Sequence, residues 1–135
     1  MFDKVVEDSI AYFNELIQKK NISLELTKED CQLLITPSKA KMLINNLLSN
    51  AIKYSPPNKK ITIIIKQSSF VIIDEGIGIA KEKLDTIFQP YKRASSYAGG
   101  FGIGLNIVDT IVKEYNYTIN IASKENKGTT VTLDF

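Results

Sequence analysis

One stretch of the chain, Leu43–Pro56, constrains the fold more than any other. Its apolar residues recur at steps of three and four, the repeat of a helix that buries one face. These residues are Leu43, Leu47, Ala51 and Tyr54. Thr36-Pro37 predicts the start of the helix, because a hydroxyl caps free amides and proline needs no amide partner there. Pro56-Pro57 predicts its end. Because the helix has an apolar face, the rest of the chain must provide a core against which that face can pack.

The same helix carries a polar face. Asn46, Asn50 and Lys53 follow one another at i, i+4 and i+7, which places the three side chains together. An amide oxygen can ligate Mg²⁺ or Ca²⁺, and a lysine can offset the charge of a phosphate. A solvated face on which the asparagines merely align explains this helix equally well.

Composition limits the class of protein. The chain has 135 residues, 44% of them hydrophobic, which suits a single domain with one core. A net charge of +2 is too small to indicate nucleic acid. With one cysteine, Cys31, and no histidine, we expect neither an internal disulfide nor a structural zinc site. No apolar run is long enough for a membrane span and no secretion signal is present, so we expect a soluble domain without membrane contact.

Other apolar patterns predict further helices and strands. Helical repeats cover Phe2–Ile17 and Ile103–Val112. Strand patterns cover Ile22–Leu26, Cys31–Ile35, Ile61–Ile65, Phe70–Ile73, Tyr117–Ile121 and Thr129–Phe135. Cys31–Ile35 is expected to be an edge or partner strand. Ile61–Ile65 and Phe70–Ile73 are expected to form one hairpin, and Tyr117–Ile121 and Thr129–Phe135 a second. Together they predict the α/β class, with helices over one face of a mixed sheet.

Two glycine-bearing stretches interrupt these elements. Asp74–Ile79 follows a buried strand, and its alternate glycines let the backbone approach another group closely, while Asp74 can accept a hydrogen bond from an exocyclic amine. An ordinary strand-to-helix turn explains it as well. Gly99–Leu105 stands at the start of a helix, where backbone amides can bind phosphate. It lacks the Gly-Lys-Ser/Thr of a P-loop and the spacing of a dinucleotide fingerprint. The polar segment before it, Gln89–Ala98, is predicted to be a flap that carries cations.

The order of these motifs closely resembles the ATP-binding catalytic domain of sensor histidine kinases. The matching segments are Asn46–Pro56, Asp74–Ile79, Ile87–Pro90, Gly100–Leu105 and Gly128–Thr130. The resemblance covers about residue 1 to the end. It implies the Bergerat fold, a two-layer α/β sandwich with three main helices on one face of a mixed sheet. Residues 1–135 would form a single catalytic domain with a flexible ATP lid at about 89–101, and ATP and Mg²⁺ as its cofactors.

For the base, the resemblance implies that Asp74 accepts from the adenine amine, while Gly76 and Gly78 keep the pocket wall close. The pocket would also include Tyr54, Ile79, Leu105 and Thr130.

For the phosphates, the resemblance implies that Asn50 holds Mg²⁺ while Asn46 and Lys53 position or neutralise phosphate oxygens. Arg93 would reach the γ-phosphate. The lid and its border would contribute Tyr91, Lys92, Gly100, Gly102, Ile103 and Gly104. Lys92 stands where the family commonly has an aromatic residue and the lid is short, which affects the details of lid closure.

Asn46 distinguishes the kinases from related enzymes of this fold. The related ATPases and the anti-sigma serine kinases carry a glutamate there as a base, whereas an amide has no basic site. The resemblance therefore implies slow hydrolysis and transfer of the γ-phosphate to a histidine on a dimerisation domain outside this chain, followed by a response regulator. It also implies a cytoplasmic domain of a membrane-anchored sensor kinase. The alternatives are an anti-sigma serine kinase, a related Bergerat ATPase, and a binding module without catalysis.

Overall fold

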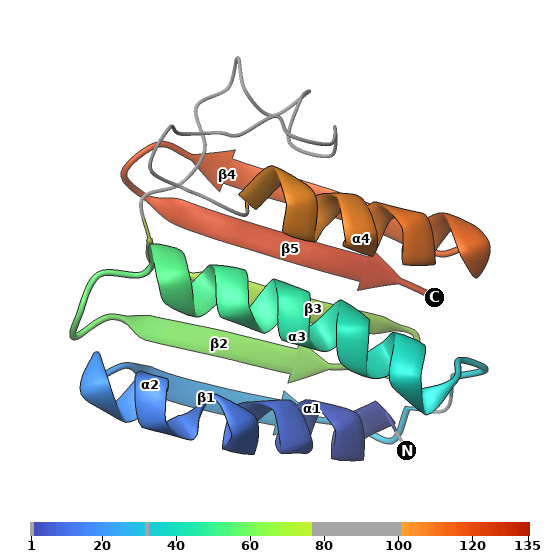
Figure 1. The fold of residues 1–135 in the computed structure, drawn as a ribbon, viewed down its shortest axis with the longest axis horizontal. Helices are drawn as coiled ribbons and strands as arrows, with labels where there is room; N and C mark the ends of the chain where they lie inside the picture. Colours follow the sequence, from blue (N-terminus) through green and yellow to red (C-terminus); the bar gives the residue numbers. More distant parts are fainter. Residues whose placement is uncertain (1, 32, 77–100) are drawn as a thin grey trace.

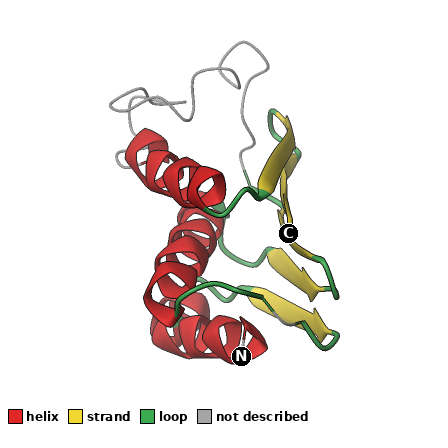
Figure 2. Cartoon of the chain, turned by 90° about the vertical axis from the view of Figure 1, so that its right-hand side faces the viewer, coloured by secondary structure: helices red, strands yellow, loops and turns green. Residues whose placement is uncertain are grey.

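The computed structural model describes residues 2–31, 33–76 and 101–135, with the backbone alone at 101–105. Its elements, in chain order, are α1 Phe2–Tyr12, α2 Asn14–Lys19, β1 Ser23–Lys28, α3 Pro37–Tyr54, β2 Lys60–Ile65, β3 Ser69–Asp74, α4 Phe101–Glu114, β4 Thr118–Lys124 and β5 Gly128–Asp134. These helices all lie on one face of the sheet (Figure 2). The predicted two-layer α/β sandwich is therefore confirmed.

The five strands form one mixed sheet in the order β1-β2-β3-β5-β4. β1 pairs with β2 in parallel, and the remaining pairs are antiparallel. The parallel pair requires a crossover, which α3 provides between β1 and β2. Both predicted hairpins, β2 with β3 and β4 with β5, are confirmed by this pairing.

The long central helix begins and ends where the sequence predicts. The Thr36 side chain accepts a hydrogen bond from the Lys39 amide at 3.3 Å, and Pro37 is the first helical residue. The helix ends at Tyr54, directly before Ser55-Pro56. It packs against α1 on one side and α4 on the other, so it forms the middle of the helical layer (Figure 1).

The prediction of a strand at Cys31–Ile35 is wrong for the described residues of that segment, which form an irregular loop. The loop connects β1 in the sheet to α3 in the helical layer. Because it crosses from one layer to the other, it does not run alongside a strand. Cys31 and Ile35 are buried in the core, whereas Leu34 is 94% exposed. Only the two end residues of this apolar run, Cys31 and Ile35, therefore join the core.

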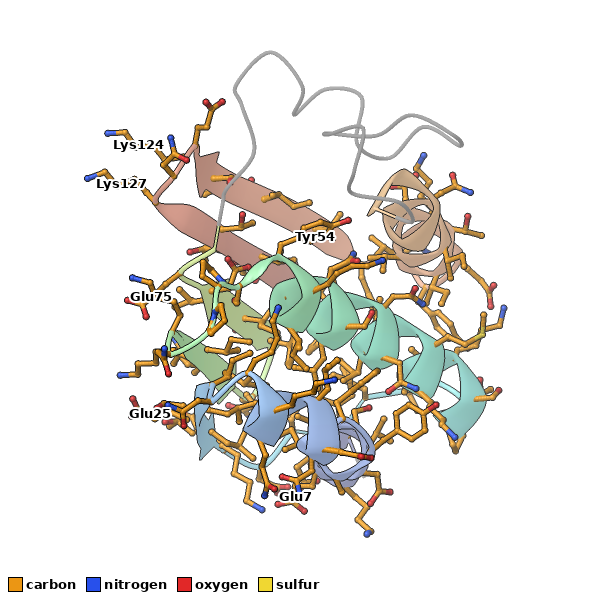
Figure 3. The ribbon with its side chains drawn as sticks, turned by 60° about the vertical axis from the view of Figure 1, so that its left-hand side comes forward. Glu7, Glu25, Tyr54, Glu75, Lys124 and Lys127 are labelled. Carbon is orange, nitrogen blue, oxygen red and sulfur yellow. The ribbon has the colours of Figure 1, made fainter. Side chains whose placement is uncertain are left out.

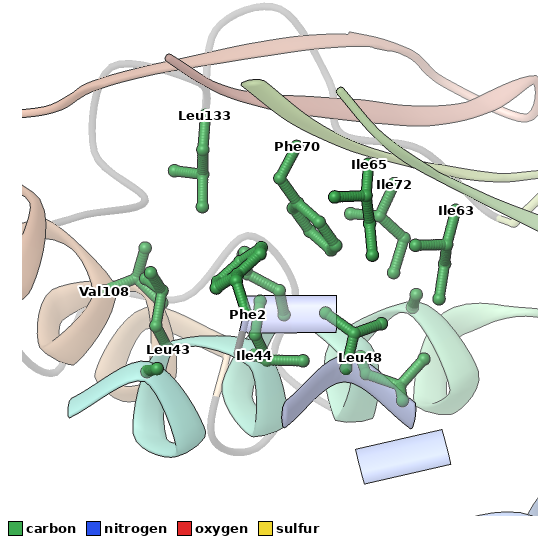
Figure 4. Close-up of a cluster of buried hydrophobic side chains, with 14 of the residues drawn as sticks. Phe2, Leu43, Ile44, Leu48, Ile63, Ile65, Phe70, Ile72, Val108 and Leu133 are labelled. Atoms are coloured by element: carbon green, nitrogen blue, oxygen red, sulfur yellow. The ribbon is translucent and has the colours of Figure 1, made fainter. Parts of the chain in front are cut away.

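The core lies between the two layers (Figure 4). α3 contributes Leu43, Ile44 and Leu48, all at most 1% exposed. Facing side chains come from every other position of the strands, including Ile63, Ile65, Phe70, Ile72 and Leu133. Because strand side chains alternate, the even-numbered residues of β3 and the odd-numbered residues of β5 point toward the helices. This phase places Asp74, the last residue of β3, on the helical side.

Candidate functional site

Several element ends meet at one end of the sandwich. α3, β3 and β4 finish there, and β5 and α4 begin there, at the left of Figure 1. Tyr54 at the end of α3 and Glu75 just after β3 lie in this region (Figure 3). The residues predicted from the asparagine helix, the first glycine stretch and the final Gly128-Thr129-Thr130 stretch are thus brought to a common end.

Asp74 is the half-buried acid of this end. Its Oδ1 accepts a hydrogen bond from the Gly76 backbone amide at 2.8 Å. Burial raises the pKa of Asp74 from 3.8 to about 6, while hydrogen bonds from the backbone amides of Gly76 and Thr129 oppose the rise. The next side chain, Glu75, is turned away and accepts from the Lys60 amide at 2.8 Å. At neutral pH the site therefore presents a carboxylate in a poorly solvated environment.

Two glycines allow the backbone to close around Asp74. A Cβ atom on Gly76 would stand 2.4 Å from the Tyr54 carbonyl oxygen and 2.8 Å from Asp74 Oδ1. A Cβ atom on Gly128 would stand 2.2 Å from the Asp74 carbonyl oxygen, and Gly128 has a φ of +117°. A side chain at either position would push β3 away from α3 or from β5. These glycines thus fix Asp74 against both neighbours.

The end of α3 is held by Lys20, the residue directly after the short helix α2. Lys20 Nζ donates to the carbonyl oxygens of Ile52 at 2.7 Å and Lys53 at 3.3 Å. A cation suits the negative end of a helix, and burial lowers the pKa of this ammonium. The Asn58 amide in turn donates to the Lys20 carbonyl at 3.0 Å. Lys20 therefore fixes the last turn of α3, whose Tyr54 carbonyl faces Gly76.

The two asparagines of α3 differ in their bonding. Asn46 Nδ2 donates to the Met42 carbonyl at 2.6 Å, one turn back along the helix. Asn50 Nδ2 is buried and has no hydrogen-bond partner among the described residues. A 180° rotation of the amide would place the Asn50 oxygen there instead, so this orphaned group is suited to a metal ion or a phosphate as its partner. The donor set fits a hard cation held through an amide oxygen.

Lys53 lies further round the helix than the asparagines. It lines a hollow of about 530 Å³ on the α2 side of α3 together with Leu16, Lys19, Lys20, Ser49 and Pro57. The described structure therefore places its side chain toward α2 and not toward Asp74. Its predicted phosphate contact would require the flexible lysine to swing toward the asparagines.

The start of α4 supplies backbone amides near the same end. Gly102 and Gly104 belong to the first turn of α4, where the amides have no partner within the helix. Ile103 and Leu105 have helical backbone there. The predicted residues Gly78, Ile79, Tyr91, Lys92, Arg93 and Gly100 lie outside the described residues, as does nearly all of the predicted lid at 89–101.

The register between β3 and β5 places the side chains of Thr129 and Thr130 on opposite faces of the sheet. Thr129 pairs with Asp74 across β3 and β5, and its backbone amide bonds the Asp74 carboxylate. Thr130 pairs with Ile73, so alternation directs its side chain to the sheet face opposite the helices. The predicted role of Thr130 stays a prediction, but the geometry favours Thr129. Sequence reasoning did not single out Thr129, because its pairing with Asp74 depends on the register between β3 and β5.

The chemistry available at this end is therefore a carboxylate acceptor, an amide orphaned among the described residues and the backbone amides of a helix start. Among the described residues no group of three or more His, Cys, Asp or Glu side chains could hold a metal. A metal ion at this end would thus need amide and ligand oxygens. No helix in the described ranges is long and apolar enough to cross a bilayer.

Comparison with known sequences assigns the family. Residues 35–135 match the family described as histidine kinase-, DNA gyrase B- and HSP90-like ATPases. The matched region begins just before α3 and runs through β5, so it contains Asn46, Asn50, Asp74 and Thr129 but not Lys20. The chain belongs to this ATPase family.

Individual relatives narrow the family to its kinase branch. The signal transduction histidine-protein kinase ArlS of Staphylococcus aureus (strain USA300) is 36% identical over 119 residues, which cover 82% of this chain and 26% of ArlS. The sensor histidine kinase ZraS of Escherichia coli (strain K12) is 31% identical over 135 residues, which cover 96% of this chain and 29% of ZraS. The chain thus spans less than a third of either relative.

A solved structure agrees with this assignment at the level of the fold. The catalytic domain of histidine kinase ThkA, in a nucleotide-free form, matches with a TM-score of 0.85 over 98% of this chain and 90% of that chain, at 23% identity. The resemblance to histidine-kinase catalytic domains is confirmed by the family, the relatives and this fold.

The raised pKa of Asp74 predicts a specific pH dependence of stability. A folded-state pKa above the unfolded value contributes stability that is present below about pH 3.8 and lost as pH rises through about 6. We expect the nucleotide-free Asp74→Asn variant to match the wild type near pH 4 and to exceed its unfolding free energy at pH 7. The excess should be about 1–3 kcal/mol, since one pKa unit is worth about 1.4 kcal/mol and the side chain keeps some solvent.

Urea unfolding at pH 4, 5, 6 and 7 measures this difference. The control is Glu125→Gln, which removes an exposed carboxylate from the turn between β4 and β5 and should follow the wild-type curve. An Asp74→Asn curve that runs parallel to the wild type across this range would show that Asp74 is not desolvated.

Proposed function

We propose that this chain binds Mg²⁺-ATP and donates the γ-phosphoryl group to a histidine on a separate dimerisation domain, as the catalytic domain of a sensor histidine kinase. The observations that carry the proposal are the half-buried Asp74 acceptor, whose neighbour Gly76 lies against the last residue of α3, and the orphaned Asn50 amide one turn earlier on that helix. The Asp74 carboxylate suits the base, and the Asn50 amide suits the metal-bound phosphates. Membership of the ATPase family and the kinase relatives support it.

Adenine recognition follows from the acceptor. The carboxylate of Asp74 can accept a hydrogen bond from the 6-amino group of adenine, and burial strengthens a charge-assisted bond of this kind. A 6-oxo purine would instead point an oxygen at the carboxylate. Gly76 lets the backbone after β3 lie against Asp74 and the Tyr54 carbonyl oxygen, where a side chain would not fit.

The phosphates would lie toward α3 and the start of α4. Asn50 would hold Mg²⁺ through its amide oxygen, and Asn46 would position the phosphates. A bound Mg²⁺ ion would neutralise phosphate charge and orient the γ-phosphoryl group. The amides at the start of α4 would bind phosphate oxygens, and Lys53 and Arg93 would add positive charge.

Asn46 favours transfer over hydrolysis. Its amide has no basic site, and its nitrogen is engaged by the Met42 carbonyl, so it cannot take a proton from water. The chain has no histidine, so the nucleophile must come from another polypeptide segment. An imidazole nitrogen would form a bond to the γ-phosphorus while the bond to the β–γ bridging oxygen breaks and ADP leaves. A response regulator would then receive the phosphoryl group, and we place the domain on the cytoplasmic side of a membrane-anchored kinase.

The metal role of Asn50 predicts a selective loss of affinity. Asn50→Ala should weaken Mg²⁺-ATP by about tenfold or more, while ATP in EDTA weakens less than about threefold, because the amide acts through the cation. The nucleotide-free variant should keep its stability, since the buried nitrogen has no partner to lose among the described residues. Titration calorimetry with and without Mg²⁺ measures both affinities.

Asn45→Ala is the matched control on the same helix. Asn45 Oδ1 accepts from Ser9 Oγ at 2.5 Å, so this variant should lose stability without separating the two nucleotide forms. Equal losses for Mg²⁺-ATP and free ATP in Asn50→Ala would mean that Asn50 does not hold the metal.

The transfer reaction tests the function as a whole. With γ-labelled ATP, the chain alone should bind nucleotide, hydrolyse it very slowly and form no phosphohistidine. Addition of the histidine-bearing dimerisation domain as a separate protein should label that domain at a rate that rises with its concentration. Asn50→Ala with the same partner should lose most of the labelling. Brisk hydrolysis by the chain alone would contradict the proposal and favour the ATPase branch of the family.

A further inference from the structure

A hollow of about 530 Å³ lies between α2 and the last turns of α3, which share one end of the helical layer (Figure 1). The residues that line it are Leu16, Lys19, Lys20, Ser49, Lys53 and Pro57. Leu16 and Pro57 make part of the wall apolar, and Leu16 is 42% exposed. Three of the other lining residues are lysines. The volume lies in the range of about 300–1,000 Å³ that is typical of ligand sites.

Lys20 provides a fixed cation at this hollow. Its ammonium group has three protons, and the carbonyl oxygens of Ile52 and Lys53 accept two of them. The third proton has no acceptor among the described residues. Because the two carbonyl bonds already hold the lysine side chain, a ligand could use the third donor without ordering that side chain first.

No carboxylate of the described residues balances the charge of the three lysines. Burial lowers the pKa of Lys20, and no neighbouring carboxylate raises it again. Lys19 and Lys53 form no ion pair within the described ranges, although Glu15 stands one turn before Lys19 on α2. Elsewhere on the surface, lysines such as Lys28 pair with glutamates. The hollow therefore combines unpaired positive charge with an apolar wall.

We propose that the hollow between α2 and α3 binds an acidic segment of a partner protein, whose carboxylates meet the lysines while an apolar side chain packs against Leu16 and Pro57. The helix ends favour carboxylates over a phosphate as the ligand. Lys53 belongs to the last turn of α3, whose carbonyl end is negative and disfavours concentrated negative charge. No helix begins among the lining residues, so the hollow lacks the backbone amides that suit phosphate.

The hollow and the nucleotide phosphates compete for Lys53. The side chain of Lys53 lines the hollow, and its proposed contact with the phosphates requires it to leave the hollow. A carboxylate bound there would keep Lys53 on the α2 side. This step of the inference rests on the proposed function, and it predicts that the acidic partner weakens Mg²⁺-ATP binding. By thermodynamic reciprocity, Mg²⁺-ATP then weakens the partner by the same factor.

Binding at the hollow is tested by nitrogen-15 NMR of the 135-residue chain with the blocked peptide Glu-Glu-Leu-Glu-Glu as the probe. The amide signals of Leu16, Lys19, Ser49 and Lys53 should shift as the peptide is added. The uncharged peptide Gln-Gln-Leu-Gln-Gln should leave them in place, and inorganic phosphate should bind more weakly than the acidic peptide. Absence of these shifts, or equal shifts with the uncharged peptide, would overturn the inference. Tighter binding of phosphate would overturn the choice of an acidic segment.

Lys19→Glu is the variant that separates the hollow from the nucleotide site. Lys19 is exposed and makes no side-chain bond within the described ranges, so the fold should tolerate the change. The variant should bind the peptide about tenfold more weakly, because one attraction becomes a repulsion, and should bind Mg²⁺-ATP like the wild type. Lys66→Glu makes the same charge change between β2 and β3, at the far end of β2, and should weaken the peptide less than about twofold. Equal losses in the two variants would overturn the hollow as the site.

Titration calorimetry tests the competition for Lys53. A saturating concentration of the acidic peptide should raise the dissociation constant of Mg²⁺-ATP about threefold or more in the wild type. In Lys53→Met the peptide should have no effect on this constant. An unchanged constant in the wild type would overturn the competition. A chain that binds the peptide at the hollow but binds no Mg²⁺-ATP would contradict the proposed function, whereas binding at the hollow would stand.

Discussion

The interaction on which the site depends is the hydrogen bonding of the Asp74 carboxylate by the backbone amides of Gly76 and Thr129. A carboxylate at the end of a buried strand is costly unless backbone donors support it. Support from both sides requires the loop after β3 and the start of β5 to approach very closely, and only Gly76 and Gly128 allow this. The two glycine motifs, far apart in the sequence, thus serve one charged group.

The rest of the fold brings a second kind of chemistry to this group. α3 crosses from β1 to β2 in the middle of the helical layer, and its last turn lies over the end of β3. Lys20 holds that turn through the carbonyls of Ile52 and Lys53, so Asn50 one turn earlier has a defined position. The groups proposed to bind the metal and the base are therefore held by separate elements that share one core.

Local signals in the sequence explain what could be predicted. The boundaries of α3 depend on Thr36-Pro37 and Pro56, which need no knowledge of distant contacts. The proposed role of Asp74 likewise came from a short motif, and it stays a prediction. The pairing of Thr129 with Asp74 depends on strand register, which only the folded sheet fixes, whereas the resemblance implied the next residue, Thr130, whose role stays a prediction. The prediction of a strand at Cys31–Ile35 was wrong, because buried apolar side chains in an irregular loop give the same sequence pattern as a short strand. The position of the Lys53 side chain beside α2 is likewise a tertiary feature.

The central claim is that Asp74, half-buried and ionised, receives the amine of the nucleotide base. Carbon-13 NMR of the aspartate side-chain carboxyls, assigned with Asp74→Asn, measures its pKa directly with and without saturating Mg²⁺-ATP. The account predicts a pKa near 6 in the free chain, and a fall of about one unit or more with ATP, since the amine stabilises the charged form. A pKa that stays the same or rises when ATP binds would contradict it.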